Sequence, residues 1–125
     1  MIEGLSLRKA NLDDTRLVYN WRFSSRAILN SWSQTIPEYA EHESYFLKNI
    51  GCYSIIMLND KSVGFVRDMD GDISIVVDMF YRGRGIGSEV LKLYSGIATI
   101  RYGNLNSFYC FLKSGWKPVG WVMKK

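Results

Sequence analysis

The sequence predicts one mixed α+β domain, residues 1–125, in which helices cover the faces of a single sheet. Its length of 125 residues, 47% of them hydrophobic, is enough for one compact core and too short for two domains. Apolar residues recur with helical spacing in some segments and alternate as in strands in others. The expected order is strand, two helices, three strands, helix, strand, helix and strand, which is typical of a sheet with helices on its faces.

The first half of the chain contains the first strand and two helices. Apolar and polar residues alternate over residues 5–8, which favours a strand. Asn11 is a predicted helix N-cap because two aspartates follow it within the first helical turn. A second helix is expected to have Pro37 in its first turn and to end at Gly51. The buried stripe of the first helix is expected to contain Leu12, Leu17, Val18 and Trp21.

A hairpin is predicted by two apolar runs, residues 53–58 and 62–66, on either side of the short turn at 59–61. Residues 68–72 then turn the chain into the next strand. The elements expected from there are a strand at 73–77, a short helix from about Ser88, a strand at 97–102, a helix from Asn104 or Asn106 to Gly115, and a strand at 118–123.

Residues 82–87, Arg-Gly-Arg-Gly-Ile-Gly, form a basic glycine-rich loop ahead of the short helix. Glycines keep Cβ atoms away from a ligand, so N–H groups at the start of the helix can point at phosphate oxygens. Arg82 and Arg84 add positive charge and the planar fork that binds phosphate. The spacing is not the G-x-G-x-x-G of a Rossmann fingerprint, and the Gly-Lys-Ser/Thr of a Walker loop is absent. A glycine-rich turn without a ligand is the alternative interpretation.

The last predicted helix carries Asn104, Ser107 and Phe111 on one stripe, since they lie at i, i+3 and i+7. Taken alone, this pattern favours a buried amphipathic helix with an asparagine cap.

Charge and cysteine content exclude several classes of function. The formal net charge is +4, and no acidic residue follows Glu89, so the C-terminal third attracts phosphates. With no Lys/Arg cluster, zinc-ligand spacing or recognition helix, we expect no nucleic-acid partner. Cys52 and Cys110 lie in apolar stretches without CxxC spacing, which indicates reduced thiols of a cytoplasmic protein. The sequence has neither an export signal nor an apolar segment long enough for a membrane span.

Two motifs together resemble the GNAT superfamily of acyl-CoA-dependent N-acetyltransferases. The acyl-CoA loop of that superfamily, R/Q-x-x-G-x-G/A, matches Arg82, Gly85 and Gly87. Its later pattern, N-x-x-A-x-x-x-Y-x-x-x-G-F, is similar to the run of Asn104, Ser107, Phe111 and Gly115-Trp116. The resemblance implies a mostly antiparallel central sheet with helices on both faces. It also implies transfer of an acetyl group from acetyl-CoA to a primary amine by direct attack, without a metal.

The resemblance also implies which residues bind acetyl-CoA. Ile75, Val76 and Val77 would lie on a splayed strand whose backbone pairs with the pantetheine arm. Asn104 and Phe111 would line the channel near the sulfur. The pyrophosphate would be held by Arg82 and the loop residues Gly83, Arg84, Gly85, Ile86, Gly87 and Ser88.

Two features depart from the pattern of the superfamily. Phe111 stands where many relatives have a tyrosine that protonates the leaving thiolate, and a phenyl ring has no proton to give. Tyr109 is about 200° away around the helix, so water, Tyr102 or no acid at all would have to serve. Only sixteen residues separate Gly87 from Asn104, so the intervening helix is short. This could leave an apolar surface for a second copy in a homodimer. A degenerate module that binds acyl-CoA or a protein without turnover is therefore the alternative function.

Acetyl transfer also needs a base and a donor to the developing oxyanion. The base candidates are His42, Glu43 and Asp72, each of which could instead form surface salt bridges. The backbone amide of Val76 or Val77 could stabilise the oxyanion, and Asp78 is expected to turn or cap the chain after the strand.

The first half resembles acetyltransferases of amino-sugar nucleotides, and also those of ribosomal-protein N-termini. The residues that carry this resemblance are Asn20-Trp21-Arg22, Arg26, Glu41-His42 and Tyr45-Phe46. It implies that Trp21 and Arg22 contact a small-molecule amine substrate such as a sugar nucleotide. Arg22 and Arg26 would bind its pyrophosphate. The alternatives are a core role for Trp21 and solvated helix charges for the arginines.

Overall fold

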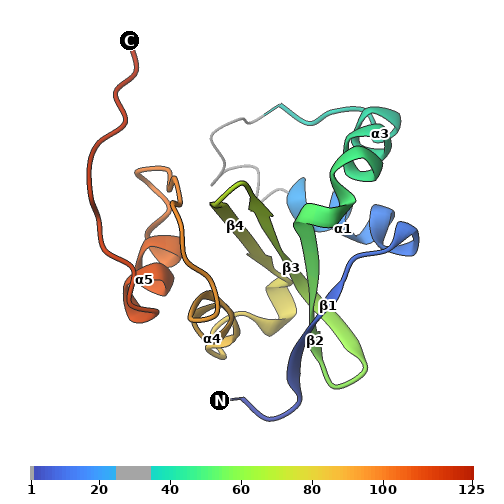
Figure 1. Cartoon of the computed structure of the whole chain (residues 1–125), viewed down its shortest axis with the longest axis horizontal. Helices are drawn as coiled ribbons and strands as arrows, with labels where there is room; N and C mark the ends of the chain where they lie inside the picture. The colour runs from blue at the N-terminus through green and yellow to red at the C-terminus, as the bar shows by residue number, and fades with distance from the viewer. Residues whose placement is uncertain (1, 25–34) are drawn as a thin grey trace.

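The centre of the computed structural model, which describes residues 2–24 and 35–125, is a four-stranded antiparallel sheet (Figure 1). The strands follow one another in the sheet in the same order as in the chain. This confirms the predicted hairpin and the mixed α+β class. The strands are β1 (Leu5–Lys9), β2 (Tyr53–Leu58), β3 (Lys61–Met69) and β4 (Asp72–Val77).

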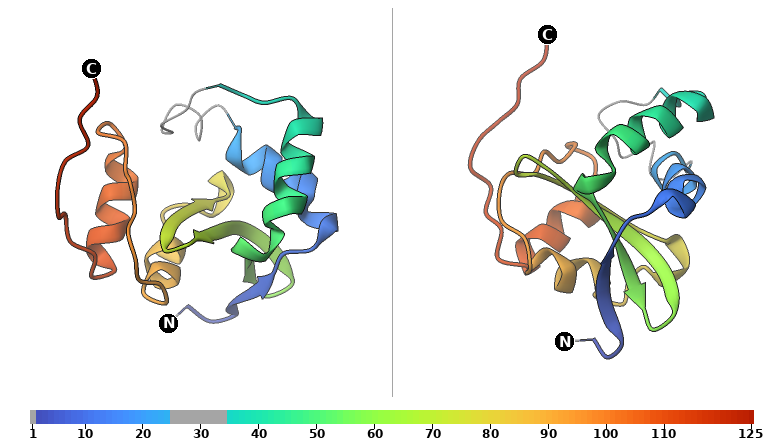
Figure 2. Two further views of the ribbon diagram at one scale, coloured as in Figure 1. Left: turned by 45° about the horizontal axis from the view of Figure 1, so that its top comes forward. Right: turned by 45° about the vertical axis from the view of Figure 1, so that its right-hand side comes forward.

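Helices cover both faces of this sheet (Figure 2). They are α1 (Thr15–Arg22), α3 (Tyr39–Asn49), α4 (Ile86–Leu91) and α5 (Leu105–Lys113), with the single 3-10 turns η1 (Leu12–Asp14), η2 (Ile50–Cys52) and η3 (Met79–Tyr81). The core under α1 and α3 contains Val18, Trp21, Phe46, Tyr53, Ile55 and Phe65. The core under α4 and α5 contains Ile56, Val63, Val66, Ile73, Ile86, Val90, Leu91 and Phe111.

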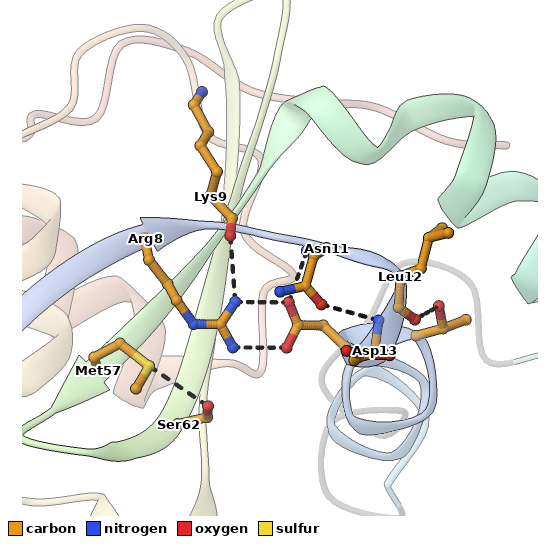
Figure 3. A network of polar contacts seen from close by, with 9 residues as sticks. Arg8, Lys9, Asn11, Leu12, Asp13, Met57 and Ser62 are labelled. Atoms are coloured by element: carbon orange, nitrogen blue, oxygen red, sulfur yellow. Dashed lines mark hydrogen bonds and ion pairs between the residues drawn. The ribbon is translucent and has the colours of Figure 1, made fainter.

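The entry into the first helix is fixed by a network of polar contacts (Figure 3). Asn11 accepts a hydrogen bond from the Asp13 N–H, and the Asp14 carboxylate accepts one from the Asn11 N–H, which completes a capping box. The Arg8 guanidinium binds both oxygens of Asp14, at 2.7 and 2.8 Å. Asn11 is therefore an N-cap as predicted, but of the 3-10 turn η1, which leads into α1 with Asp14 as the N-cap of that helix. Arg8 ties this turn to β1.

The second predicted helix is confirmed, but both of its ends differ. Pro37 was expected in its first turn and instead precedes the N-cap residue Glu38. Helix α3 ends at Asn49, and the chain continues through the 3-10 turn η2, which contains Gly51. Gly51 therefore lies inside a tighter turn and does not cap the α-helix. Since η2 leads directly into β2, it fixes where α3 lies relative to the sheet.

Two predicted strands were wrong. Of residues 97–102, only Ile97 bonds to the sheet, in an isolated parallel bridge to Asp72. Residues 118–123 form no strand, and Figure 1 shows the chain after α5 running away from the domain. The apolar side chains of this segment lie in solvent. Trp121 is 91% exposed.

Candidate acyl-CoA and acceptor site

One edge of β4 is open beyond Ile73 within the described part of the chain. The Ile73 N–H donates to Ile97 O at 2.8 Å on this edge, whereas the Asp78 N–H donates to Val63 O at 2.7 Å on the side of β3. Successive strand residues direct their N–H and C=O groups to opposite edges. The main-chain groups of Ile75 and Val77 therefore face the open edge, and those of Val76 face β3.

Ile75, Val76 and Val77, which the sequence analysis assigned to the acyl-CoA strand, thus differ in the edge that their main-chain groups face. The amides of Ile75 and Val77 are directed to where an extended ligand could pair with the strand. The amide of Val76 is directed to β3, its register partner being Phe65. Of the two oxyanion donors considered from the sequence, only Val77 is oriented toward the open edge.

The glycine-rich loop begins where the open edge ends. Arg82 Nε donates to Val77 O at 3.0 Å, which holds the loop against the end of β4. Gly83 and Gly85 have φ values of +78° and +81°, which favour glycine, and both are exposed. Arg84 donates to Phe80 O at 3.3 Å and lies over the ring of Tyr81. Both arginines are on the surface next to the exposed main chain of the loop.

The second half of the glycine-rich loop, residues 86–88, packs against α5. Ile86 is buried, and a Cβ on Gly87 would lie 2.9 Å from Cys110 Sγ in α5. Ser88 Oγ lies 3.6 Å from the same sulfur. The first intrahelical bond runs from Glu89 N–H to Gly85 O, so the N–H groups of residues 86–88 lie outside the helical ladder. Their amides can bind an anion although their side chains pack inside.

The stripe on α5 is structural in this conformation. Asn104 caps the helix by accepting a hydrogen bond from the Ser107 N–H at 3.3 Å. Phe111 is 5% exposed, and its ring centroid lies 4.9 Å from that of Trp116. Trp116 Nε1 in turn donates to Leu91 O at 3.2 Å, which joins the end of α5 to α4. Phe111 thus presents almost no surface to a ligand. The structure agrees with the alternative given by the sequence pattern, a buried amphipathic helix with an asparagine cap.

A separate pocket of about 420 Å³ lies between α1, α3 and the β2–β3 hairpin. It contains two of the residues expected on the amine side, His42 and Arg22. The residues that line it are Val18, Arg22, Phe23, Thr35, Pro37, Glu41, His42, Tyr45, Tyr53 and Arg67.

The three base candidates differ in their surroundings. His42 is buried, and its Nε2 lies 3.0 Å from Thr15 O, so Nε2 carries the proton of that hydrogen bond. Burial lowers the pKa of His42 and favours the neutral imidazole, with an opposing effect of the Thr15 bond. Glu43 and Asp72 are exposed and are not among the lining residues. Only His42 of the three is brought to the pocket.

The other expected acceptor residues are separated by the fold. Trp21 is 6% exposed, and its Nε1 donates to Asp78 Oδ2 at 2.9 Å, which favours the alternative of a core role. Asp78 also accepts from the Phe80 N–H, which confirms that it caps the turn after β4. Arg22 lines the pocket, and Arg26 lies outside the described residues.

Solved structures with this arrangement are acetyltransferases. A GNAT-family acetyltransferase from Bacillus anthracis matches with a TM-score of 0.79 at 19% identity, over 94% of this chain and 82% of that one. The chain has the GNAT fold. A phosphinothricin acetyltransferase from Sinorhizobium meliloti in complex with AcCoA has a TM-score of 0.73 at 21% identity, over 94% and 77% of the two chains. AAC(6')-Ib in complex with Ribostamycin and Coenzyme A has a TM-score of 0.72 at 18% identity, over 94% and 86%. No protein-family model and no curated protein matches the sequence.

The GNAT fold confirms the architecture that the two motifs implied. The neighbours do not distinguish the amino-sugar branch from the ribosomal-protein branch. Two further findings concern the described residues alone. The described residues contain no group of three or more His, Cys, Asp or Glu side chains that could hold a metal ion. They also form no helix with the length and apolarity needed to cross a membrane.

Sequence reasoning missed Arg67, which lines the pocket from β3. Arg67 follows Phe65 by two residues, so both side chains are on the face of the sheet that α1 and α3 cover. In the sequence, Arg67 is a charged residue at a strand position whose side chain should face the core, and this pattern could have identified it.

Proposed function

We propose that this chain is an N-acetyltransferase that moves an acetyl group from acetyl-CoA to a primary amine. The observation that carries the proposal is the continuity of the open β4 edge with the basic glycine loop, in a chain with the GNAT fold. Neighbours with this fold were crystallised with acetyl-CoA or CoA. The main-chain groups of Ile75 would pair with the pantetheine arm, and the Val77 N–H would face the thioester carbonyl. The loop amides, with Arg82 and Arg84, would bind the pyrophosphate.

The chemistry requires a neutral amine beside the thioester carbonyl. The amine nitrogen forms a bond to the carbonyl carbon, the C–S bond breaks, the amine loses a proton, and CoA leaves as the thiol after its sulfur gains one. The Val77 N–H is the proposed donor to the oxyanion. His42 is the proposed base, because its Nδ1 is the free proton acceptor once Nε2 donates to Thr15 O. Glu43 and Asp72 remain weaker candidates on account of their exposure.

The proposed acceptor is a small-molecule amine, with an amino-sugar nucleotide as the specific candidate. The volume of the pocket suits a small molecule, and Arg22 within it could bind a phosphate. We place the reaction in the cytoplasm, where acetyl-CoA and reduced thiols coexist; Cys52 and Cys110 are both free thiols.

A homodimer is the proposed assembly. The apolar side chains of the chain end are exposed, which supports contact with a second copy. They are Val119, Trp121, Val122 and Met123. Mass measurement in solution tests this: replacement of Trp121 by serine should convert a dimer into a monomer, and a monomeric unmodified protein refutes the dimer.

A binding module without turnover is the second candidate function. Two observations favour it: Phe111 is a buried phenyl ring at the position of the expected tyrosine, and the strand after α4 is reduced to one bridge. An assay of CoA thiol release with acetyl-CoA and a panel of primary amines separates the two. Amine-dependent release supports the enzyme. Saturable binding of acetyl-CoA without release under any amine supports the module and contradicts the enzyme.

A further inference from the structure

Two arginines share the pocket between α1, α3 and the β2–β3 hairpin. Arg22 enters it from the end of α1, and Arg67 enters it from β3. Burial, followed by the positive charge of Arg67, lowers the pKa of Arg22, so the two charges are close enough to oppose each other. Bringing two like charges together costs free energy unless something of opposite charge compensates it.

The described residues leave one donor of Arg67 unsatisfied. Arg67 Nε is buried and has no hydrogen-bond partner among them. The single carboxylate that lines the pocket belongs to Glu41, an exposed residue of α3. The ion pairs of the described chain, Arg8 with Asp14 and Lys92 with Glu89, involve neither Arg67 nor Glu41. The sequence of residues 25–34 contains no Asp or Glu, so no carboxylate can come from that segment.

We propose that the acceptor of the acetyl transfer carries a negatively charged group, a phosphate or a carboxylate, and that Arg22 and Arg67 bind this group in the pocket. This inference rests on the proposed function. An unsatisfied guanidinium N–H next to a second guanidinium provides the charged, forked donors that suit either anion. The volume of about 420 Å³ leaves room for a small molecule around the anion.

The position of Arg67 in the sheet relates the anion site to the proposed reaction centre. Arg67 is the register partner of Ser74 on β4, and Ser74 directly precedes Ile75, whose main chain faces the open edge. An acceptor bound through its anion at Arg67 therefore lies beside the middle of β4, in the pocket that His42 of α3 also lines. The anionic group would fix one end of the acceptor and leave its amine free to reach the thioester.

The same charges predict which amines are rejected. An acceptor with several ammonium groups and no anion would be repelled by Arg22 and Arg67. The specificity would then differ from that of the neighbour described as an aminoglycoside acetyltransferase, since aminoglycosides are polycations. The difference in acceptors would come from the pocket, while the acetyl-CoA side of the fold stays the same.

Direct binding tests the anion site without any need for catalysis. Inorganic phosphate and sodium acetate are titrated separately into ¹⁵N-labelled protein at constant ionic strength. The Arg67 Nε–H signal is identified by its loss in Arg67→Lys. We expect that signal to move in a saturable way with at least one of the two anions, and the anion that moves it at the lower concentration indicates the source. A signal that neither anion moves overturns the proposal.

Kinetics then tests the role of the site with three primary amines of similar size: butylamine, 4-aminobutyrate and 3-aminopropyl phosphate. Arg22→Gln and Arg67→Gln should each raise the KM for the preferred anionic amine by roughly 10- to 100-fold, with little change for butylamine. Lys61→Gln removes one charge from the other end of the same hairpin and should change neither value. Equal effects of the arginine variants on charged and uncharged amines contradict the proposal. If acetyl-CoA does not bind, the proposed function fails, but the Arg67 signal still reports on the anion site.

Discussion

The α-carbon of Gly87 faces Cys110 Sγ so closely that a Cβ at residue 87 would lie 2.9 Å from the sulfur. Gly87 starts the buried side of α4, and Cys110 lies in the middle of α5. The last glycine of the glycine-rich loop therefore allows two helices to approach each other. By contrast, Gly83 has nothing within 4 Å of an added Cβ. The glycines of one motif thus serve different purposes.

Gly87→Ala should lower the free energy of unfolding by about 1–3 kcal/mol, because the added methyl group overpacks the contact between α4 and α5. Urea unfolding followed by circular dichroism measures the change. Gly83→Asn is the matched control, because asparagine tolerates a positive φ and the position is open; it should be nearly neutral. Cys110→Ala in the Gly87→Ala background should recover part of the loss. No recovery would show that the sulfur is not the cause.

Asp14→Asn should destabilise the protein by about 1–3 kcal/mol. It removes the doubly bonded partner of Arg8 and the carboxylate half of the capping box. Asp13→Asn is the control, since Asp13 lies in the same turn and its side chain is exposed. Equal losses from the two substitutions would indicate a general charge effect at the start of the helix, contrary to the assigned role of Arg8.

Stability should fall in acid partly because of Asp14. Burial alone would raise the pKa of this carboxyl, but the hydrogen bonds from Arg8 and Asn11, with the Arg8 charge, give a net lowering. A lowered folded-state pKa contributes stability that is fully present above the unfolded value, about 3.9, and is lost as the pH falls through the folded value. Unfolding free energies of the unmodified protein and Asp14→Asn should therefore converge below pH 4. A constant difference down to pH 2 contradicts this origin.

The buried imidazole of His42 should act in a higher pH range. Burial lowers its pKa below the ordinary value of 6.5. Its contribution to stability is therefore present above about pH 6.5 and is lost as the pH falls through the lower folded-state value. His42→Gln should flatten the dependence of unfolding free energy on pH just below about pH 6.5, as measured by urea titrations. The same slope in both proteins would show that the neutral ring is not favoured by folding.

As the proposed base, His42 should also affect the reaction more than the binding. His42→Gln should lower kcat by roughly 100-fold or more and leave the affinity for acetyl-CoA unchanged. Glu43→Gln, one residue further along α3 and exposed, should leave kcat nearly unchanged. If Glu43→Gln has the larger effect on kcat, the base is misassigned.

Local patterns in the sequence were sufficient for most of the fold. The hairpin follows from two apolar runs around a short turn, and the caps at Asn11 and Asn104 follow from side chains that bond to nearby N–H groups. The absence of a strand at 97–102 was not predictable in this way. The apolar residues of this segment satisfy a strand pattern, but a strand exists only where a ladder continues, and here it ends after Ile97.

The site was harder to predict than the fold because its parts come from distant segments. The glycine-rich loop is one contiguous run of residues, so the sequence alone was enough to recognise it. The pocket requires α1, α3 and the hairpin to meet, so Arg67 was missed. The hydrogen bond between Trp21 and Asp78 also joins distant segments and could not be read from the sequence. The division of β4 into amides facing β3 and amides facing the open edge depends on strand register, which no local pattern fixes.

Titration of ¹⁵N-labelled protein with acetyl-CoA tests the central claim most directly, because the claim concerns particular main-chain amides. We predict saturable shifts of the amide signals of Ile75, Val77 and residues 83–88, with much smaller shifts in β1 and β2. Folded protein in which these signals stay unchanged at millimolar acetyl-CoA would contradict the account.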